Sequence, residues 1–465
     1  MGGTASNANC ELHHHDRHRV AMVCDFFYPS TGGVENHILQ LAQCLLHLGH
    51  KVIVITHKYG DRNGVRWLAG GLKVYYVPIS SVYDRCMMPT GFLLLPLLRD
   101  ILVREHITTV HTHAVCTMSF EAITLAALMG YRVVHTEHSN FGFTSPLDIH
   151  LNKVEQFILC SADTAISVSH ASKENLCLRC RLNPQEGFVI PNAVESTEFQ
   201  PNPNVVRPKD SVNVVVLMRL VWRKGVHLLV RIVPDVCRRF PYVHFIIGGD
   251  GPRRAALEEM RERHHLQDRV ELLGAVQHSD VPSVLTRGHV FLNTSLTEAF
   301  GIAILEAVSC GLTVVSTRVG GVPEILPAHM INLTDPEPAA ILEALSEVIP
   351  FAKKRPLAVN FHKDVSCMYS WLNVAKRTTR VYNALGMRPR LTLLQRFQTL
   401  RALGGLAGGI AVCSVAWHHL VLWLLRRWRP AEEIEVAPDF PRAKWTIKRV
   451  KHEPFPISSL QSRKP

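Results

Sequence analysis

Residues 19–56 read RVAMVCDFFYPSTGGVENHILQLAQCLLHLGHKVIVIT, and their pattern indicates the architecture of the chain. An apolar run at 19–24 is followed by a stretch at 34–48 whose apolar residues recur at helical spacing, and by a second apolar run at 51–56. Nearly continuous apolar strands on either side of a helix are typical of a parallel sheet that helices cover on both faces. This stretch therefore predicts the first strand–helix–strand unit of a doubly wound α/β domain.

The same alternation continues along most of the chain. Further strands are expected at 73–77, 108–111, 132–135 and 164–168, and again at 213–218, 243–248, 270–273, 290–293 and 313–316. A proline-rich segment at 201–210 separates the two sets. We therefore expect an α/β protein with two facing Rossmann-like domains. Ligands would bind in the cleft between them, where the carboxyl ends of the strands meet.

A long apolar stretch near the C-terminus predicts a helix that crosses a membrane. Residues 402–425 contain no charged side chain and lie between Arg401 and Arg426, and about 20 apolar residues are enough to cross a bilayer as a helix. A buried C-terminal helix is the alternative. The expected segments are a disordered tail at 1–18, Rossmann-like domains at 19–200 and 211–362, a helix with a basic juxtamembrane segment at 363–401, the transmembrane helix at 402–425 and a short tail at 426–465.

The charge distribution also favours a membrane. The chain of 465 residues has a net charge of +12. From residue 376 onward there are 17 Lys or Arg and 5 Asp or Glu, so the whole excess flanks the apolar stretch. Such flanks favour an anionic membrane surface over a nucleic acid. The 12 scattered cysteines and the polar N-terminus favour a cytosolic location for the folded domains, which would place the tail at 426–465 across the membrane.

Two motifs that follow expected strands could bind an anion. In residues 29–35, Gly32 and Gly33 open a helix and would let a ligand approach the backbone closely, although a plain tight turn has the same pattern. In residues 219–225, Arg219 and Lys224 lie five residues apart beside a helix start. Two cations in that position could clamp a diphosphate, and the alternative is a solvated basic loop.

Three further motifs lie at the expected cleft. Glu298 and Glu306 are separated by seven residues. A helix that begins near Phe300 would leave Glu298 at the cleft and place Glu306, two turns on, on the same side; structural ion pairs are the alternative. The loop at 248–252 contains Gly249 and Gly251 and allows another close approach or an ordinary turn. His138 follows a strand of the first domain, where a lone histidine is often structural.

The sequence lacks the motifs of several other catalytic and metal-binding sites. The sequence contains no Asp-x-Asp, G-x-S-x-G or H-E-x-x-H, and Cys177-x-x-Cys180 has no partner pair. The pair His111 and His113 is interpreted as a strand-end pair with satisfied hydrogen bonds. No metal ion or other cofactor is therefore expected.

The glycine loops, the Arg219 and Lys224 pair and the E-x7-E motif, in this order, resemble the retaining GT-B glycosyltransferases of family 4. The resemblance covers about residues 19–385. Segments at 25–29, 57–60, 294–300 and 316–321, with the C-terminal apolar stretch, resemble more closely the catalytic subunits of the GPI-N-acetylglucosaminyltransferases.

The resemblance implies roles for individual residues. Catalytic roles are expected for Arg219, Lys224, Glu298 and His138, and substrate-binding roles for Gly32, Gly33, Gly249, Gly251, Phe300, Gly301 and Glu306. Arg219 and Lys224 would hold the UDP diphosphate, Glu306 the ribose hydroxyls and Glu298 the donor sugar. The acceptor would bind on the side of the first domain, and UDP-GlcNAc would be a substrate rather than a cofactor.

The resemblance also implies an activity and a place in the cell. It implies transfer of GlcNAc from UDP-GlcNAc to phosphatidylinositol with retention, the first step of GPI-anchor biosynthesis. The catalytic domains would face the cytosol at the endoplasmic reticulum membrane, with the other subunits of the transferase complex as partners and no nucleic acid. The alternatives are a family-4 transferase with another membrane-bound acceptor and a non-catalytic membrane scaffold with the same fold.

Overall fold

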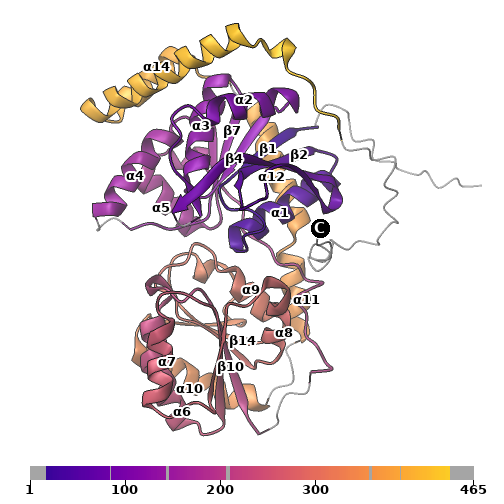
Figure 1. Ribbon diagram of the computed structural model, residues 1–465. Helices are drawn as coiled ribbons and strands as arrows, with labels where there is room; N and C mark the ends of the chain where they lie inside the picture. Colours follow the sequence, from indigo (N-terminus) through magenta and orange to yellow (C-terminus); the bar gives the residue numbers. More distant parts are fainter. Residues whose placement is uncertain are drawn as a thin grey trace, which may run out of the picture.

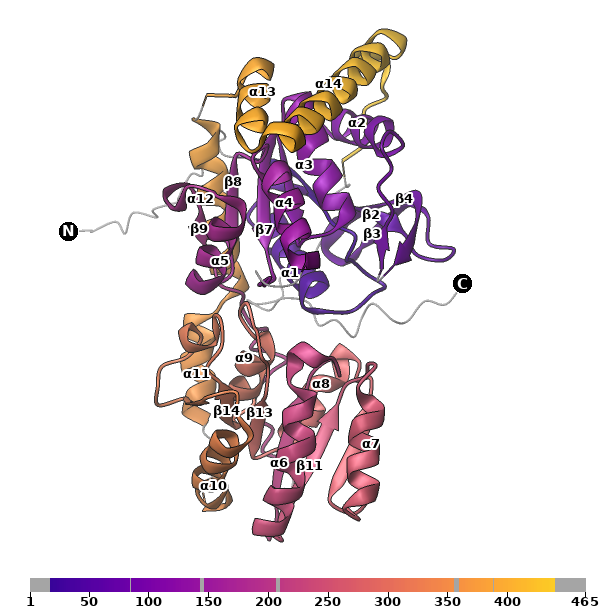
Figure 2. The same cartoon turned by 90° about the vertical axis from the view of Figure 1, so that its left-hand side faces the viewer.

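The structure, a computed structural model, describes residues 17–83, 85–142, 146–205, 210–354, 359–387 and 389–439. The expected disordered tail at 1–18 lies almost wholly outside the described residues, as does most of the tail expected at 426–465. The described chain forms two α/β halves placed end to end, and one apolar helix lies across the outer side of the N-terminal half (Figures 1 and 2).

The N-terminal half is built on a nine-stranded sheet of order β3-β4-β2-β1-β6-β7-β8-β9, with β5 paired to β4. Its strands are β1 (Arg19–Val23), β2 (Lys51–Lys58), β3 (Gly64–Leu68), β4 (Leu72–Tyr83), β5 (Cys86–Met87), β6 (Thr109–His113), β7 (Arg132–Glu137), β8 (Thr164–Ser167) and β9 (Phe188–Val189). All neighbours are parallel except β3 and β5, which run antiparallel to β4. The helices are α1 (Gly33–His47), α2 (Leu94–Arg104), α3 (Thr117–Met129), α4 (Pro146–Leu159) and α5 (His170–Cys180).

The C-terminal half contains a six-stranded parallel sheet of order β12-β11-β10-β13-β14-β15. Its strands are β10 (Val212–Leu217), β11 (Val243–Gly248), β12 (Val270–Gly274), β13 (Val290–Asn293), β14 (Thr313–Thr317) and β15 (Ile331–Thr334). Its helices are α6 (Val226–Arg239), α7 (Arg254–Arg263), α8 (Val281–Thr286), α9 (Ile302–Ser309), α10 (Pro338–Lys354) and α11 (Val359–Met368). The two sheets confirm the predicted fold of two doubly wound domains.

Two features differ from the expected pattern. The antiparallel edge of β3 and β5 was not predicted, because β3 is largely exposed and lacks the continuous apolar run of a central strand. The helix expected within residues 363–401 is interrupted: α11 ends at Met368, and α12 (Trp371–Gly386) begins after a break at Tyr369 and Ser370. After this break the chain returns to the N-terminal half, where α12 packs against α1.

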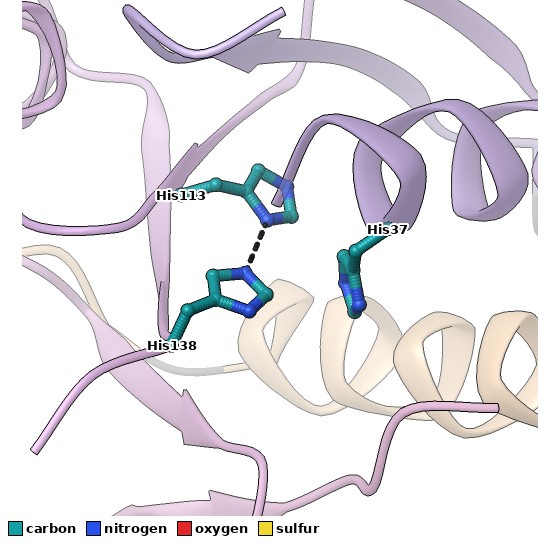
Figure 3. Close-up of side chains that lie close together, drawn as sticks. All are labelled: His37, His113 and His138. Carbon is teal, nitrogen blue, oxygen red and sulfur yellow. Dashed lines mark hydrogen bonds between the residues drawn. The ribbon is translucent and has the colours of Figure 1, made fainter. Parts of the chain in front are cut away.

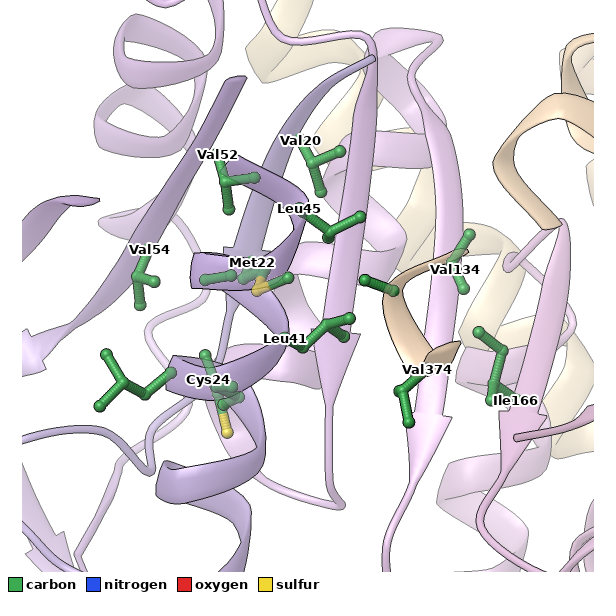
Figure 4. Packing of buried hydrophobic residues seen from close by; sticks show 14 of the residues in the cluster. Val20, Met22, Cys24, Leu41, Leu45, Val52, Val54, Val134, Ile166 and Val374 are labelled. Atoms are coloured by element: carbon green, nitrogen blue, oxygen red, sulfur yellow. The ribbon is translucent and has the colours of Figure 1, made fainter. Parts of the chain in front are cut away.

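The core of the N-terminal half shows why α12 belongs there. Side chains from β1, β2, α1 and α12 form one buried cluster (Figure 4). Val374 on α12 lies in the same cluster as Val20, Met22 and Leu41, and all four side chains are buried. Burial of apolar surface contributes about 25 cal/mol of stability per Å². This burial holds α12, which follows the C-terminal half in the chain, against the N-terminal half.

Two helices follow α12 along the chain. Helix α13 (Leu393–Ala402) begins with a capping box in which Thr392 and Gln395 satisfy each other's backbone N–H groups. Helix α14 (Gly405–Trp428) is the one helix in the described ranges that is long and apolar enough to cross a membrane. It packs against α3 on the side of the N-terminal half that faces away from the C-terminal half (Figures 1 and 2).

Candidate active site

The centre of the site is an ion pair between two loops of the C-terminal half. Lys224 follows β10 in a 3₁₀ turn at Trp222–Lys224, and Glu298 follows β13, the strand beside β10. Lys224 Nζ lies 2.5 Å from Glu298 Oε2, which also accepts a hydrogen bond of 3.2 Å from Ser295 Oγ. The two side chains are largely but not fully buried, at 20% and 17% exposed. A cation is thus held at the carboxyl edge of the sheet, where ligands of such folds bind.

Gly225 explains how the two loops come so close. Its φ is +73°, and a Cβ atom there would lie 1.9 Å from the carbonyl oxygen of Thr294. The Oγ1 of Thr294 donates to the carbonyl of Lys224, and the N–H of Leu296 donates to the carbonyl of Arg223. The loops after β10 and β13 are therefore joined through hydrogen bonds to their backbones. Arg219 lies at the start of the first loop with an exposed side chain.

The loop with Gly249 and Gly251 packs against the same segment. A Cβ atom on Gly249 would lie 1.8 Å from the carbonyl oxygen of Met218, and one on Gly251 would lie 2.7 Å from that of Leu220. Both residues have positive φ, at +136° and +151°. The packing of the two loops therefore requires glycine at both positions. The sequence predicted that a ligand approaches these glycines closely, whereas in the structure it is the backbone of residues 218–220 that does so.

Helix α9 carries the second carboxylate of the E-x7-E motif. Gly301, with φ +91°, is its N-cap, and the preceding residue Phe300 is buried against Tyr369. Glu306 is buried on this helix. Burial raises the pKa of Glu306 to about 8, and the nearby charge of Glu198 adds to the rise. A buried carboxyl of this kind gains from hydroxyl donors such as those of a ribose.

The N-terminal half reaches the same region through the start of α1. A Cβ atom on Gly33 would lie 3.8 Å from Cδ1 of Ile302, the first residue of α9. Gly32 accommodates the folded-back carboxylate of Glu35, since a Cβ there would lie 2.5 Å from Glu35 Oε2. Glu35 is buried and accepts a hydrogen bond from Ser30 Oγ, and sequence reasoning did not assign it a role.

Contacts across the cleft were not predicted from the sequence. Asn140 Nδ2 donates to the carbonyl of Glu298 at 3.1 Å, and Ser169 Oγ donates to the carbonyl of Ala299 at 2.7 Å. The carboxylate of Glu324 accepts from the first two N–H groups of α5, at 2.6 and 2.8 Å. These residues follow β7, β8 and β14, and that position at the carboxyl ends of expected strands is the signal in the sequence that could have placed them at the cleft.

His138 lies in a cluster of three imidazoles (Figure 3). His113 Nδ1 is 3.3 Å from His138 Nε2, and His37 on α1 is hydrogen-bonded to Asn192 at 2.8 Å. Burial lowers the pKa of His37 to about 4 and holds the pKa values of His113 and His138 well below the usual range, so all three are neutral at pH 7. Nitrogen atoms of the three lie within 4.8 Å of one another, which is compatible with a metal ion.

A second group beside this cluster fixes the loop of His138. Glu137 Oε1 accepts from the N–H groups of His138 and Ser139, at 2.9 and 2.8 Å. Its other oxygen faces Arg179 at 3.5 Å, and Arg179 is also paired with Glu155. Glu137 thus binds both the backbone of the loop and the Arg179 guanidinium, and Glu155 binds the same guanidinium. His138 therefore lies on an anchored loop, which contacts Glu298 through Asn140.

Comparison with known proteins identifies the class. The sucrose-phosphate synthase of Thermosynechococcus elongatus matches with a TM-score of 0.65 and 20% identity over 80% of this chain and 99% of that one. Anabaena HepE in complex with UDP matches with a TM-score of 0.60 and 17% identity over 79% of this chain and all of that one. The glycosyl transferases group 1 family matches residues 199–356. The chain is a glycosyltransferase of the GT-B fold.

The sequence comparisons are more specific. The GPI-anchor biosynthesis family PIGA matches residues 57–145. A phosphatidylinositol N-acetylglucosaminyltransferase subunit of Arabidopsis thaliana is 52% identical over 90% of this chain and 94% of the relative, and that of Homo sapiens is 48% identical over 92% and 90%. This chain therefore belongs to the family of these phosphatidylinositol N-acetylglucosaminyltransferase subunits of GPI-anchor biosynthesis. The relatives bear the name of one component of a multi-subunit enzyme.

Proposed function

We propose that this chain is the catalytic subunit that transfers GlcNAc from UDP-GlcNAc to phosphatidylinositol, with retention of configuration at the anomeric carbon. The Lys224 and Glu298 pair at the edge of the C-terminal sheet carries the proposal, because it holds a cation where a donor diphosphate would bind. The names of the relatives support the donor and the acceptor. We further propose that the chain works with the other subunits of the transferase complex, on the cytosolic face of the endoplasmic reticulum membrane.

Each candidate residue has a separate role in the proposed transfer. The diphosphate of the donor would bind the Lys224 ammonium and the exposed Arg219 guanidinium, and these cations would stabilise the charge that develops as UDP leaves. Glu306 would accept hydrogen bonds from the ribose. Since Lys224 is already held by Glu298, donor binding would exchange one anionic partner for another and leave the Glu298 carboxylate available to the sugar hydroxyls.

Retention is explained by attack on the face from which UDP leaves. Glu306 is buried, and the carboxylate of Glu298 would be occupied by hydroxyls of the donor sugar, so neither would form a covalent sugar intermediate. The leaving diphosphate would itself accept the proton of the attacking inositol hydroxyl. His138, neutral because burial lowers its pKa, would act as a hydrogen-bonding group near the donor sugar rather than as a charge. The two cations would neutralise the diphosphate without a metal ion.

A transfer assay tests the proposal. The chain is expressed in membranes that lack the endogenous counterpart and retain the partner subunits, and labelled UDP-GlcNAc is added. We expect label in a lipid fraction that phosphatidylinositol-specific phospholipase C releases, in an α-linkage, and loss of that label with Glu306→Gln. Label in a lipid that the phospholipase does not release would favour another membrane acceptor. Absence of transfer by folded protein in the assembled complex would favour a non-catalytic scaffold.

A further inference from the structure

The turn after β2 carries an arginine at the edge of the N-terminal sheet where ligands of such folds bind. Strand β2 is parallel to β1, so its carboxyl end lies at the same edge as the loop that leads to Gly32 and Gly33; Figure 2 shows β2, β3 and β4 together at one side of this half. The chain reverses directly after β2. The N–H of Tyr59 donates to the carbonyl of Arg62 at 3.2 Å, and the N–H of Arg62 donates to that of Tyr59 at 2.9 Å. The side chain of Arg62 is exposed.

Two tyrosines attach this turn to the loop between β1 and α1. Tyr59 Oη donates to the carbonyl of Asp25 at 2.6 Å and accepts from the N–H of Phe27 at 3.2 Å. Tyr76 Oη donates to the carbonyl of Tyr28 at 2.9 Å. These partners all belong to the loop that opens α1, and the start of α1 is the part of the N-terminal half that approaches α9. The turn after β2 is therefore fixed beside the candidate active site.

The guanidinium of Arg62 lies over one of these tyrosines. Its Cζ is 5.7 Å from the centroid of the Tyr76 ring, a cation–π distance. Burial raises the pKa of Tyr76, and the charges of Arg62 and Arg66 oppose this rise. Among the described residues Arg62 has no ion pair with a carboxylate, whereas Nη1 of Arg85 lies 3.8 Å from Glu35 Oε1. Arg62 is therefore a cation held over an aromatic ring without an anionic partner.

A fixed cation on this side of the cleft fits the charge of the acceptor. Lys224 and Arg219 would meet the donor diphosphate from the C-terminal half, whereas the acceptor of the proposed function carries one phosphodiester on the ring that holds the attacking hydroxyl. An arginine guanidinium is planar and offers paired N–H donors that match a phosphate. We propose that Arg62 binds the phosphodiester of the phosphatidylinositol acceptor and so positions the inositol ring at the loop that opens α1. This inference rests on the proposed function and adds an acceptor-binding residue to it.

Exposed apolar side chains near this turn suit a lipid. His57 Nε2, at the end of β2, lies 2.9 Å from the carbonyl oxygen of Arg85, and this contact holds the hairpin of β4 and β5 against the end of β2. The hairpin exposes Val82 and Tyr83, at 68% and 82%. A phosphodiester bound at the turn would thus have apolar surface close by for the glycerol and acyl part of the lipid, a part that a soluble inositol phosphate lacks.

Steady-state kinetics of the assembled complex test the assignment. Transfer from labelled UDP-GlcNAc is measured in mixed micelles, first with the mole fraction of phosphatidylinositol varied and then with the donor varied. Arg62→Gln removes the charge and keeps most of the length of the side chain. We expect the KM for phosphatidylinositol to rise about 10- to 100-fold, the usual effect of losing a hydrogen bond to a charged group, and the KM for UDP-GlcNAc to stay unchanged. Arg62→Lys should give an intermediate KM for the lipid, because it keeps the charge and loses the planar fork.

Competition by soluble fragments of the acceptor identifies the group that Arg62 binds. Glycerophosphoinositol carries the phosphodiester without acyl chains, and myo-inositol carries neither. In Arg62→Gln the inhibition constant of glycerophosphoinositol should rise by the same factor as the KM for the lipid, while that of myo-inositol should not change. Arg238→Ala, which removes an exposed cation of the C-terminal half, is the matched control and should change neither constant. Where Arg62→Gln fails to assemble, Arg62→Lys gives the same comparison.

The contrary results are distinct from one another. An unchanged KM for phosphatidylinositol in Arg62→Gln would overturn the inference, and a lower Tm with unchanged KM values would show that the residue is structural. A rise in the KM for UDP-GlcNAc alone would also overturn it, because the arginine would then belong to the donor site. Each of these results leaves the proposed function standing. Absence of transfer to phosphatidylinositol by the natural chain in the assembled complex would instead overturn the proposed function, and this inference with it.

Discussion

Lys224 Nζ lies 2.5 Å from Glu298 Oε2, and the two residues come from loops that follow adjacent strands of the C-terminal sheet. The hydrogen bonds between these loops hold the pair in place before any donor binds. A cation fixed in this way requires little reorganisation when negative charge develops on a leaving diphosphate, which is the property that makes electrostatic stabilisation effective in enzymes.

Replacement of Lys224 by Ala is expected to lower kcat for GlcNAc transfer by about 10²–10³-fold, the usual effect of losing one preorganised group that stabilises the transition state. The side chain is partly exposed and its backbone contacts do not depend on it, so the variant should stay folded. The measurement is a transfer assay at saturating donor. Arg238→Ala, which removes a cation from an exposed ion pair at the far end of α6, should leave kcat unchanged.

Glu306 is expected to lower the stability of the protein when no donor is bound. Its folded-state pKa of about 8 lies above the ordinary value of 4.5, so the buried carboxyl resists ionisation. The penalty is absent below about pH 4.5, grows between pH 4.5 and pH 8, and is constant above that range. At about 1.4 kcal/mol per pKa unit it amounts to roughly 3–5 kcal/mol. Glu306→Gln should therefore raise Tm increasingly as the pH rises through this range.

Thermal unfolding of the purified full chain at pH 5, 7 and 9 measures this effect. Tm of Glu306→Gln minus that of the natural chain should be near zero at pH 5 and largest at pH 9, while transfer activity is lost. Equal Tm differences at all three pH values would contradict the titration of Glu306. Loss of activity with a lower Tm would indicate that the residue has a structural role.

The order of strands and helices could be predicted from the sequence because each central strand carries its own apolar run. The positions of Lys224 and Glu298 at one edge of the sheet could be predicted because the two residues follow such strands, β10 and β13. The sequence did not show that the two form an ion pair, since that depends on the close packing that Gly225 permits. Spacing along a chain fixes which edge of a sheet a residue occupies, not which side chain it faces.

Contacts between distant segments account for most of what was not predicted. The return of α12 to the N-terminal core joins Val374 to Val20, which lie more than 350 residues apart in the sequence. The amphipathic pattern of α12 is compatible with either half. The apolar composition of α14 likewise indicates a membrane, and its packing against α3 follows only from the tertiary structure.

Gly249→Ala is expected to destabilise the C-terminal half by about 3 kcal/mol or more, because its Cβ would meet the Met218 carbonyl at 1.8 Å and its φ of +136° is unfavourable for alanine. Tm should fall by roughly 6–12 °C. Gly386→Ala is the matched control, since a Cβ there meets nothing within 4 Å, and its Tm should not fall. An unchanged Tm for Gly249→Ala, with a raised KM for the donor, would instead assign the glycine to the ligand.

Removal of divalent metal ions is expected to leave transfer unchanged, because Arg219 and Lys224 would supply the charge that meets the diphosphate. Of the described residues, two groups could hold a metal ion: His37, His113 and His138, and His135, Glu137 and Glu155. In the first group His113 and His138 are hydrogen-bonded to each other and His37 to Asn192, and in the second Glu137 and Glu155 are paired with Arg179. Dialysis of the complex against a chelator, followed by assay with and without added Mg²⁺, Mn²⁺ or Zn²⁺, measures the dependence. A loss of activity that one of these ions restores in the natural chain but not in His113→Gln would contradict the expectation and assign the ion to the histidine cluster.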